Sequence, residues 1–338
     1  MPAEPHVWVL SRGRKGDLDQ MLALAKATGW PYEVKTLAFR GPEIPVLSKL
    51  LLKDGLSPPW PDLVLCAEAS PSVIAKDIKR RSRGRTRAVA IGRPAGSAAG
   101  FDLVITTAQY RIPAAANVVE LSMPLAAQSE EAAEESPDGP IALIIGGPAF
   151  PDILDGPTAD KLAADTLTYA AGKNRLLSVQ TSPRTPSAAI AAFERAIRPP
   201  HVLGIFGRGE NRYRAVLGHA SEIVVTSDSV SMVSDALASG KPVSIYPLPQ
   251  ARNAKLRLGD WLYRNAVESP SPGFAPVRWL FDSGLIEAAA DRRRLFARLV
   301  AEGRLAWFGA PLQPAQPGAA RRDLDKAVQS LRNLMAHP

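Results

Sequence analysis

Short apolar runs rich in β-branched residues alternate with amphipathic segments along most of the chain. In the first part, the apolar runs predict strands at residues 6–10, 32–37, 62–67, 87–91, 101–106 and 117–121. Amphipathic segments between some of these runs predict helices at 17–28 and 71–81. Strands that alternate with helices are typical of a parallel, doubly wound sheet.

The acidic segment 128–140 interrupts this alternation. It has no strand-forming residues and ends in proline and glycine, so it predicts a linker between domains. The alternation then resumes, with strands expected at 141–145, 175–180, 202–206, 222–226 and 242–246. Helices are expected between them at 158–171, 186–197, 211–220 and 230–239.

We therefore expect an α/β fold with two Rossmann-like domains, each a doubly wound parallel sheet. The expected boundaries are 1–126 for the first domain, 127–140 for the linker and 141–310 for the second domain. Residues 311–338 are expected to form a Pro/Ala/Gly tether and a last helix near 321–335. The length of 338 residues agrees with two domains, since a domain typically has about 100–200 residues.

The net positive charge of the chain favours anionic binding partners but does not distinguish among them. The chain has 41 Lys and Arg against 33 Asp and Glu, a net charge of +8, which favours nucleic acid, anionic lipid or phosphorylated substrates alike. No apolar run approaches the roughly 18 residues of a membrane span, and we find no signal-peptide pattern. The one cysteine, Cys66, cannot form an internal disulfide, so we expect a buried thiol and a cytoplasmic protein.

The most informative stretch is a buried strand that runs into hydroxylated residues and then into a helix beginning around Ser229–Ser231. A helix N-terminus offers free N–H groups and partial positive charge, which suit a phosphate. Asp228 and Ser229 could instead simply cap the helix. Asp235 lies one turn beyond Ser231 on the same face, where its carboxylate could accept hydrogen bonds from the paired hydroxyls of a sugar.

A second strand-to-helix junction lies at residues 177–186. Thr185 is a good N-cap and Pro186 a good first helical residue, and Ser182 precedes them. Arg184 could make a forked contact with a phosphate, or it could be a solvated loop arginine. Both junctions should lie at the carboxyl edge of one parallel sheet, where such folds bind ligands.

Glycine turns add weaker candidates. Gly13, Lys15 and Gly16 could form an anion-binding loop after the first strand, although the spacing is not that of a P-loop. Gly146 and Gly147 would let the backbone approach a ligand closely. The segment 207–212 begins like a dinucleotide fingerprint but has arginine where the third glycine belongs.

Other chemistries are set aside. The four histidines and one cysteine show no zinc-ligand spacing, so no metal site is expected. No serine-hydrolase motif occurs, so a serine hydrolase is not expected. Asp17 and Asp19 resemble a metal-binding pair but more simply complement the dipole of a helix. The basic run 79–87 is typical of a solvated helix end, or it could seat the protein on anionic lipid at the inner membrane. It lacks interleaved aromatics, so nucleic acid is not expected.

With these motifs the chain resembles the bacterial branch of the mitochondrial-fission ELM (elongated mitochondria) family, formerly described as predicted nucleoside-diphosphate-sugar epimerases. The resemblance covers about residues 6–310. The matching segments are Gly16–Gln20, Leu22–Ala25, Pro61–Val64, Ile144–Pro148, Ser182–Pro186, Gly209–Tyr213 and Val225–Ser234.

The resemblance implies a GT-B glycosyltransferase-like fold, with two domains that face a cleft, the first on the acceptor side and the second binding a nucleotide sugar. It implies roles for several residue groups: the donor diphosphate near Ser229, Val230 and Ser231, the ribose near Asp235, the phosphate side at Ser182, Arg184 and Thr185, and the nucleoside near Arg208, Gly209 and Asn211.

The chain departs from the family pattern at Asp17, where histidine is usual, and at Asp235, where glutamate is usual. Asp17 or Glu68 could be the general base for an acceptor hydroxyl. The resulting hypothesis is a metal-independent transferase that takes a nucleotide sugar as its substrate and needs no cofactor. A non-catalytic scaffold that recruits a partner and a nucleotide-sugar epimerase are the alternatives. The oligomeric state is left open.

Overall fold

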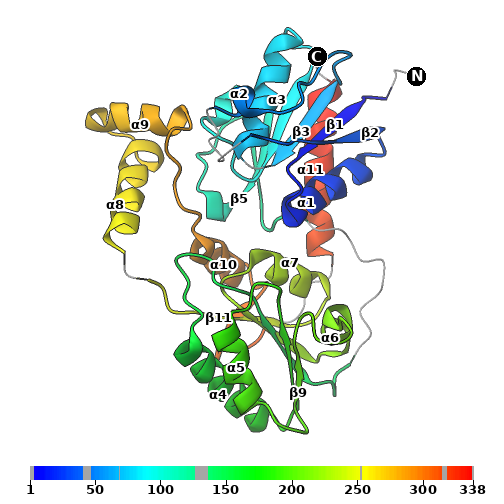
Figure 1. The fold of residues 1–338 in the computed structure, drawn as a ribbon, viewed down its shortest axis with the longest axis vertical. Coiled ribbons are helices and arrows are strands. Elements are labelled where there is room, and N and C mark those ends of the chain that lie inside the picture. Colours follow the sequence, from blue (N-terminus) through cyan, green and yellow to red (C-terminus); the bar gives the residue numbers. More distant parts are fainter. Residues whose placement is uncertain are drawn as a thin grey trace. The chain divides into compact units, whose positions relative to one another are not determined.

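The computed structural model describes residues 4–40, 47–67, 69–125, 136–251, 253–313 and 318–336, without the side chains of Lys15, Ala319 and Ala320. The chain forms two compact units, each with its own parallel sheet (Figure 1). Unit 1 comprises residues 1–127, 253–291 and 321–338, and unit 2 comprises residues 128–252 and 292–320.

The sheet of unit 1 has six parallel strands in the order β2-β1-β3-β4-β5-β6. Its strands are β1 (Val7–Ser11), β2 (Tyr32–Thr36), β3 (Leu63–Ala67), β4 (Arg87–Ile91), β5 (Leu103–Thr107) and β6 (Val118–Leu121). Its first helices are α1 (Lys15–Thr28), α2 (Ser48–Leu51) and α3 (Ala69–Arg81), with 3₁₀ turns η2 (Ala98–Gly100) and η3 (Ala108–Tyr110). All the predicted strands of this unit are confirmed to within two residues at each end.

Successive residues of β1 and β3 supply two core layers because side chains alternate across a sheet. Val7 and Val9 belong to one buried cluster, while Trp8 and Leu10 belong to the cluster on the other face with Cys66. The Cys66 side chain is buried and lies 3.5 Å from the Val89 carbonyl oxygen, and burial raises the pKa of its thiol to about 12. The expectation of a buried thiol is confirmed.

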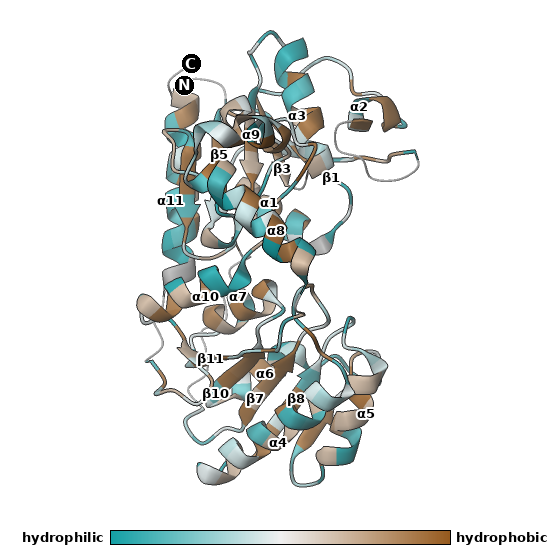
Figure 2. Cartoon of the chain, turned by 90° about the vertical axis from the view of Figure 1, so that its left-hand side faces the viewer, coloured by the Kyte–Doolittle hydropathy of each residue, from teal (hydrophilic) through white to brown (hydrophobic). Residues whose placement is uncertain are grey.

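The sheet of unit 2 also has six parallel strands, in the order β12-β11-β10-β7-β8-β9. Its strands are β7 (Ile141–Ile145), β8 (Leu177–Thr181), β9 (Val202–Gly204), β10 (Glu222–Thr226), β11 (Val243–Tyr246) and β12 (Ala306–Trp307). Its helices are α4 (Gly156–Gly172), α5 (Ser187–Ala196), α6 (Tyr213–His219), α7 (Val230–Ala238) and α10 (Arg292–Ala301). Figure 2 shows apolar β7 and β10 beside helices with mixed surfaces, as expected when a sheet is covered on both faces.

The segment 253–291 belongs to unit 1, whereas the sequence assigned it to the second domain. It contains α8 (Ala254–Tyr263), the π-helical turn η4 (Arg264–Glu268), the 3₁₀ turn η5 (Pro272–Phe274) and α9 (Ala275–Asp282). Arg111, after β5, forms ion pairs with Asp260 and Glu268, and the Tyr263 hydroxyl donates to the Arg111 carbonyl at 2.9 Å. These contacts join segments that lie about half the chain apart, so no local pattern could reveal them.

The C-terminal helix α11 (Ala319–Ala336) also belongs to unit 1 (Figure 1). Leu324, Ala327 and Leu331 join the same buried cluster as Val7 and Val9. The Asp323 carboxylate accepts hydrogen bonds from the amides of residues 122 and 123, both at 3.1 Å. The predicted terminal helix is therefore confirmed, and it is an integral layer of the first core rather than a free appendage.

Candidate functional site

The strand order of unit 2 brings two loops together at the carboxyl edge of its sheet. The winding of the chain reverses between β7 and β10, since β8 and β9 lie on one side of this pair and β11 on the other. In sheets of this kind, ligands bind where the loops diverge at the reversal. Gly146 and Gly147 follow β7, and Ser227, Asp228 and Ser229 follow β10.

Hydrogen bonds from the glycine turn hold these two loops together. The Gly146 amide donates to Thr226 Oγ1 at 2.9 Å, and the Gly147 amide donates to Asp228 Oδ2 at 2.6 Å. A Cβ on Gly146 would overlap the Asp228 carboxylate, and one on Gly147 would overlap the backbone of Arg184. Both positions therefore require glycine for close packing, and both amides are used inside the protein.

The hydroxyls of Ser182 and Thr185 hold the same turn from the β8 side. Ser182 Oγ donates to the Gly146 carbonyl at 2.8 Å, and Thr185 Oγ1 donates to it at 2.6 Å. The Ser182 amide in turn donates to Thr185 Oγ1 at 2.9 Å, and both side chains are buried. The prediction that Thr185 caps α5 was wrong. Pro186 occupies the N-cap position, and the Thr185 hydroxyl donates to the Gly146 carbonyl instead.

The start of α7 has no side-chain cap. Ser229 is the N-cap residue, but its hydroxyl makes no capping hydrogen bond and lies 3.3 Å from Ser231 Oγ. Asp228 does not cap the helix either, because its Oδ2 accepts from Gly147. The simple capping alternative is therefore wrong, and the first-turn N–H groups of α7, which include that of Val230, carry the partial positive charge that suits an anion.

Asp228 is an unusual neighbour for such a helix end. The residue is only 3% exposed, and its Oδ1 is buried without a hydrogen-bond partner. Burial raises the pKa of this carboxyl, while the Thr226 hydroxyl, the Gly147 amide and the charge of Arg184 act in the opposite direction. Arg184 itself is exposed on the β8–α5 loop.

Asp235, the predicted ribose contact, lies exposed on α7. The Tyr213 hydroxyl donates to Asp235 Oδ2 at 3.0 Å, and burial together with the charge of Asp235 raises the pKa of Tyr213. Tyr213 begins α6, and its amide donates to Asn211 Oδ1 at 3.1 Å. The tyrosine therefore orients the carboxylate, and this was not foreseen because the two residues belong to different helices.

The remaining residues expected near a nucleoside lie in the turn before α6. Arg208 pairs with Glu194 of α5, and both side chains are exposed. Gly209 has a φ of 79°, a backbone conformation that favours glycine. The structure thus gives Arg208 and Asn211 local partners, and their roles toward a nucleoside stay predictions.

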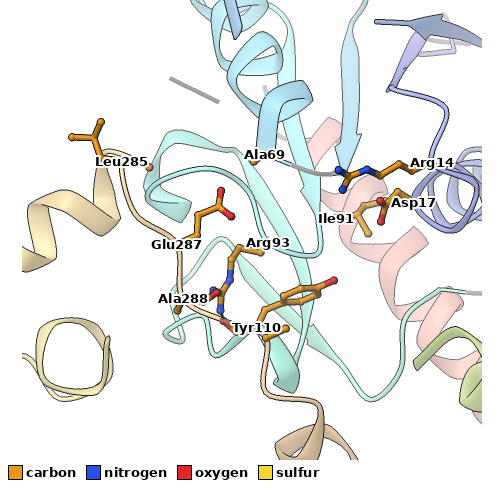
Figure 3. A pocket seen from close by; sticks show the side chains of 11 residues that line it. Arg14, Asp17, Ala69, Ile91, Arg93, Tyr110, Leu285, Glu287 and Ala288 are labelled. Atoms are coloured by element: carbon orange, nitrogen blue, oxygen red, sulfur yellow. Dashed lines mark hydrogen bonds between the residues drawn. The ribbon is translucent and has the colours of Figure 1, made fainter. Parts of the chain in front are cut away.

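Unit 1 contains a cavity of about 540 Å³ at the corresponding edge of its own sheet. There the winding reverses between β1 and β3. The cavity is lined by Arg14, Asp17, Ala69, Ile91, Arg93, Tyr110, Gly284, Leu285, Glu287, Ala288 and Ala290 (Figure 3). Five of these belong to the strap 284–290, a segment that carries no recognisable motif.

Asp17 is one of the two predicted bases, and it lies in this cavity in the first turn of α1. Burial raises the pKa of its carboxyl, and the nearby Arg14 opposes this effect. Burial and the charge of Asp17 also raise the pKa of Tyr110. Arg14 and Asp17 lie on one side of the cavity, with Arg93 and Glu287 on the other (Figure 3). Glu68 lies outside the described residues.

The predicted anion loop of unit 1 is partly used internally. Gly13 has a φ of 85°, and its amide donates to Ser11 Oγ at 2.9 Å. Gly16 lies in the first turn of α1, with open space around it. The side chain of Lys15 lies outside the described part of the chain, so its predicted contact with a phosphate stays a prediction.

Arg93 fixes the strap to the cavity. Its guanidinium donates to the carbonyls of Tyr110 and Ala288 and lies 5.4 Å from the ring centroid of Tyr263. Burial lowers its pKa. Arg93 therefore builds the cavity wall, a role that the sequence did not suggest because its partners come from three distant segments.

The basic run 79–87 is largely engaged in ion pairs within unit 1. Arg80 pairs with Asp77 at 2.7 Å, while Lys79 and Arg87 pair with Asp102 at 2.9 and 3.5 Å. These contacts fit the helix-end interpretation, and contact with anionic lipid stays a prediction. In the described part of the chain, no helix combines the length and apolar character needed to cross a bilayer.

A family model described as "Mitochondrial fission ELM1" matches residues 15–270, and no curated protein matches the chain. Similar solved structures include MurG of Acinetobacter baumannii, with 16% identity, 96% of this chain and 99% of that chain covered, and a TM-score of 0.43. Arabidopsis thaliana UGT89C1 complexed with UDP-L-rhamnose has 12% identity, coverages of 98% and 100%, and a TM-score of 0.47. A putative UDP-N-acetylglucosamine 2-epimerase from Listeria monocytogenes has 8% identity, coverages of 89% and 96%, and a TM-score of 0.46.

Proposed function

The chain belongs to the mitochondrial fission ELM1 family, and from this premise we propose that it is a metal-independent, GT-B-type glycosyltransferase. Its donor would be a nucleotide-diphosphate sugar bound by unit 2, and its acceptor would be a hydroxyl compound bound by unit 1. The observation that carries the proposal is the uncapped N-terminus of α7 at the winding reversal of the second sheet.

This helix end suits a diphosphate for two reasons. The first-turn amides, which have no carbonyl partner within the helix, and the helix dipole both favour negative charge. The hydroxyls of Ser229 and Ser231 lie 3.3 Å apart at this helix end, and the one that does not donate to the other can donate to a phosphate. Hydrogen bonds from the Gly146 amide to Thr226 and from Ser182 to the Gly146 carbonyl hold the neighbouring loops together, which supports a site that is formed before the ligand arrives.

The same helix offers a second contact for the nucleotide. Asp235 lies on α7 with its Oδ2 held by Tyr213, and a carboxylate in a fixed orientation can accept hydrogen bonds from vicinal ribose hydroxyls. Aspartate reaches less far than the glutamate usual in the family, and the Tyr213 contact holds its carboxylate in one orientation.

Transfer needs a stabilised leaving group and a base. The departing nucleoside diphosphate would be stabilised by the α7 N-terminus and by Arg184, whose guanidinium can form a forked contact with phosphate oxygens. Asp17 would remove the proton of the acceptor hydroxyl, since its raised pKa brings it closer to that of an effective base at neutral pH. In the transfer, the acceptor hydroxyl gives its proton to a carboxylate base, its oxygen forms the new bond to the sugar carbon, and the bond from that carbon to the phosphate oxygen breaks.

Calorimetry tests the donor site directly. The full chain is titrated with UDP-, GDP-, ADP- and dTDP-linked sugars, and at least one should bind. Asp235→Asn should weaken that binding, whereas Asp160→Asn, a change in an exposed ion pair on α4, should not. If no nucleotide sugar binds the wild-type protein, the proposal is wrong.

A scaffold without turnover is the second candidate function, and the family match favours it. The proposed transferase, a scaffold and the remaining alternative, an epimerase, differ in what happens to a bound donor. A transferase releases free nucleoside diphosphate when the acceptor is present, an epimerase alters the sugar without an acceptor, and a scaffold leaves the donor unchanged. Chromatography of the nucleotide after long incubation with cell-extract acceptors separates these outcomes.

A further inference from the structure

We propose that Asp228 binds the donor diphosphate as a neutral carboxylic acid, so that each nucleotide sugar that binds brings one proton from solvent into the site. This inference rests on the proposed function. It adds Asp228 to the residues that contact the donor and couples donor binding to the uptake of a proton. Oδ1 of Asp228 would carry the proton and donate it in a hydrogen bond to a phosphate oxygen.

The first argument is the position of the carboxylate. Asp228 directly precedes Ser229, the N-cap residue of α7, so it lies next to the amides that would receive the phosphate. It is 3% exposed, and a Cβ on Gly146 would overlap its carboxylate. If it turned out to solvent, it would lose the hydrogen bond from the Gly147 amide.

The second argument is the unequal use of its two oxygens. Oδ2 accepts from the Gly147 amide at 2.6 Å, a charge-assisted length. Oδ1 is buried and has no hydrogen-bond partner. A buried polar atom without a partner is costly, so a native structure that keeps one usually has a ligand, a water or a proton there.

The third argument is electrostatic. A diphosphate at the α7 N-terminus would bring negative charge beside an ionised Asp228 in a poorly solvated place, and two adjacent anions there cannot both stay ionised cheaply. Arg184 is the charged group that acts on Asp228, and the Thr226 hydroxyl and the Gly147 amide also favour its ionised form. The diphosphate and an ionised Asp228 would compete for the positive charge of Arg184. Protonation of the Asp228 carboxyl is then the simplest way to remove the repulsion between the two anions.

Protonation also gives the unpartnered Oδ1 of Asp228 a hydrogen-bond partner. A neutral carboxyl has one O–H donor and keeps acceptor capacity. The acceptor atom Oδ2 stays with Gly147, and the new O–H on Oδ1 gains a phosphate acceptor. No bond other than this O–H forms, and the proton comes from the buffer.

The test is calorimetry of the full chain with the nucleotide-diphosphate sugar that binds best. Such a ligand is esterified at both ends of the diphosphate, so its phosphates do not titrate between about pH 6 and 8.5. Titrations in buffers with different ionisation enthalpies count the protons exchanged. We expect uptake of up to one proton per ligand, and above the pKa of the free protein an affinity that falls by up to about tenfold per pH unit.

Asp228→Asn supplies the matched variant because its amide can donate from the same position without titrating. It should bind with little pH dependence and exchange no proton, whereas Asp160→Asn should keep the wild-type uptake. The wild-type measurement stands alone if Asp228→Asn does not fold. Binding without proton uptake, or with proton release, overturns this inference and leaves the proposed function standing. Absence of binding at every pH overturns both.

Discussion

The Tyr213 hydroxyl donates to Asp235 Oδ2 at 3.0 Å and so connects the first residue of α6 to the middle of α7. The contact fixes an exposed carboxylate on the helix whose N-terminus is the proposed phosphate site. A carboxylate held in one orientation pays less conformational entropy when it binds a pair of hydroxyls. The two residues are therefore expected to act as one unit in donor recognition.

Tyr213→Phe tests this unit. Loss of one hydrogen bond to a carboxylate should weaken nucleotide-sugar binding by about 1 kcal/mol, which is about fivefold. Affinity is measured by calorimetry, and the double variant with Asp235→Asn should bind no more weakly than Asp235→Asn alone. Additive losses in the double variant would show that the two residues act separately.

Replacing Gly146 by alanine should lower the stability of the fold more than the same replacement at Gly218. Gly146→Ala places a Cβ against the Asp228 carboxylate and should destabilise the fold by about 1–3 kcal/mol. Gly218, in α6, has open space where its Cβ would lie, so Gly218→Ala should be neutral or stabilise by up to about 1 kcal/mol. Urea denaturation of the two variants measures the difference, and equal midpoints would contradict the packing described here.

The ion pairs of Arg111 with Asp260 and Glu268 are expected to hold residues 253–291 on unit 1. Its side chain is 5% exposed and pairs with Glu268 at 2.5 Å as well as with Asp260. Arg111→Ala leaves Glu268 without its partner and should cost about 3 kcal/mol. Hydrogen exchange should rise across 253–291.

The control for this change is Arg195→Ala, which removes an exposed ion pair and should change stability by less than about 1 kcal/mol. Unchanged exchange at α8 in Arg111→Ala would show that other contacts hold the segment.

The elements followed from the sequence because their signals are local. Strands β4, β7 and β10 begin and end where the apolar runs predicted, since both faces of each strand are buried. The two-residue strand β12 was missed because it is too short to show any periodicity. The assignment of 253–291 failed for a different reason: its partners, among them Arg111, are more than 140 residues away.

The candidate site was predictable only as a set of loops. Hydroxylated residues after strands identified Ser229 and Ser182 as candidates, but not that Ser182 would spend its hydroxyl on the Gly146 carbonyl. Asp228 appeared as one of two possible caps. Its internal hydrogen bond with Gly147 depends on the strand order of the sheet, which brings the loops of β7 and β10 together.

Asp17 gives a pH prediction whose sign is fixed by its environment. Burial raises its pKa in the folded protein above the unfolded value, so the folded state binds the proton more tightly. The carboxyl therefore contributes stability below the unfolded pKa that is lost as pH rises through the folded pKa. Asp17→Asn should match wild type near the acidic end and become more stable than wild type toward neutral pH, by less than about 1 kcal/mol because the residue is only half-buried.

Thermal unfolding at several pH values checks this, with Asp19→Asn as the control on the same helix. A wild type more stable than Asp17→Asn at neutral pH would mean that Arg14 and the α1 dipole outweigh burial, and Asp17 would then be a weaker base than proposed.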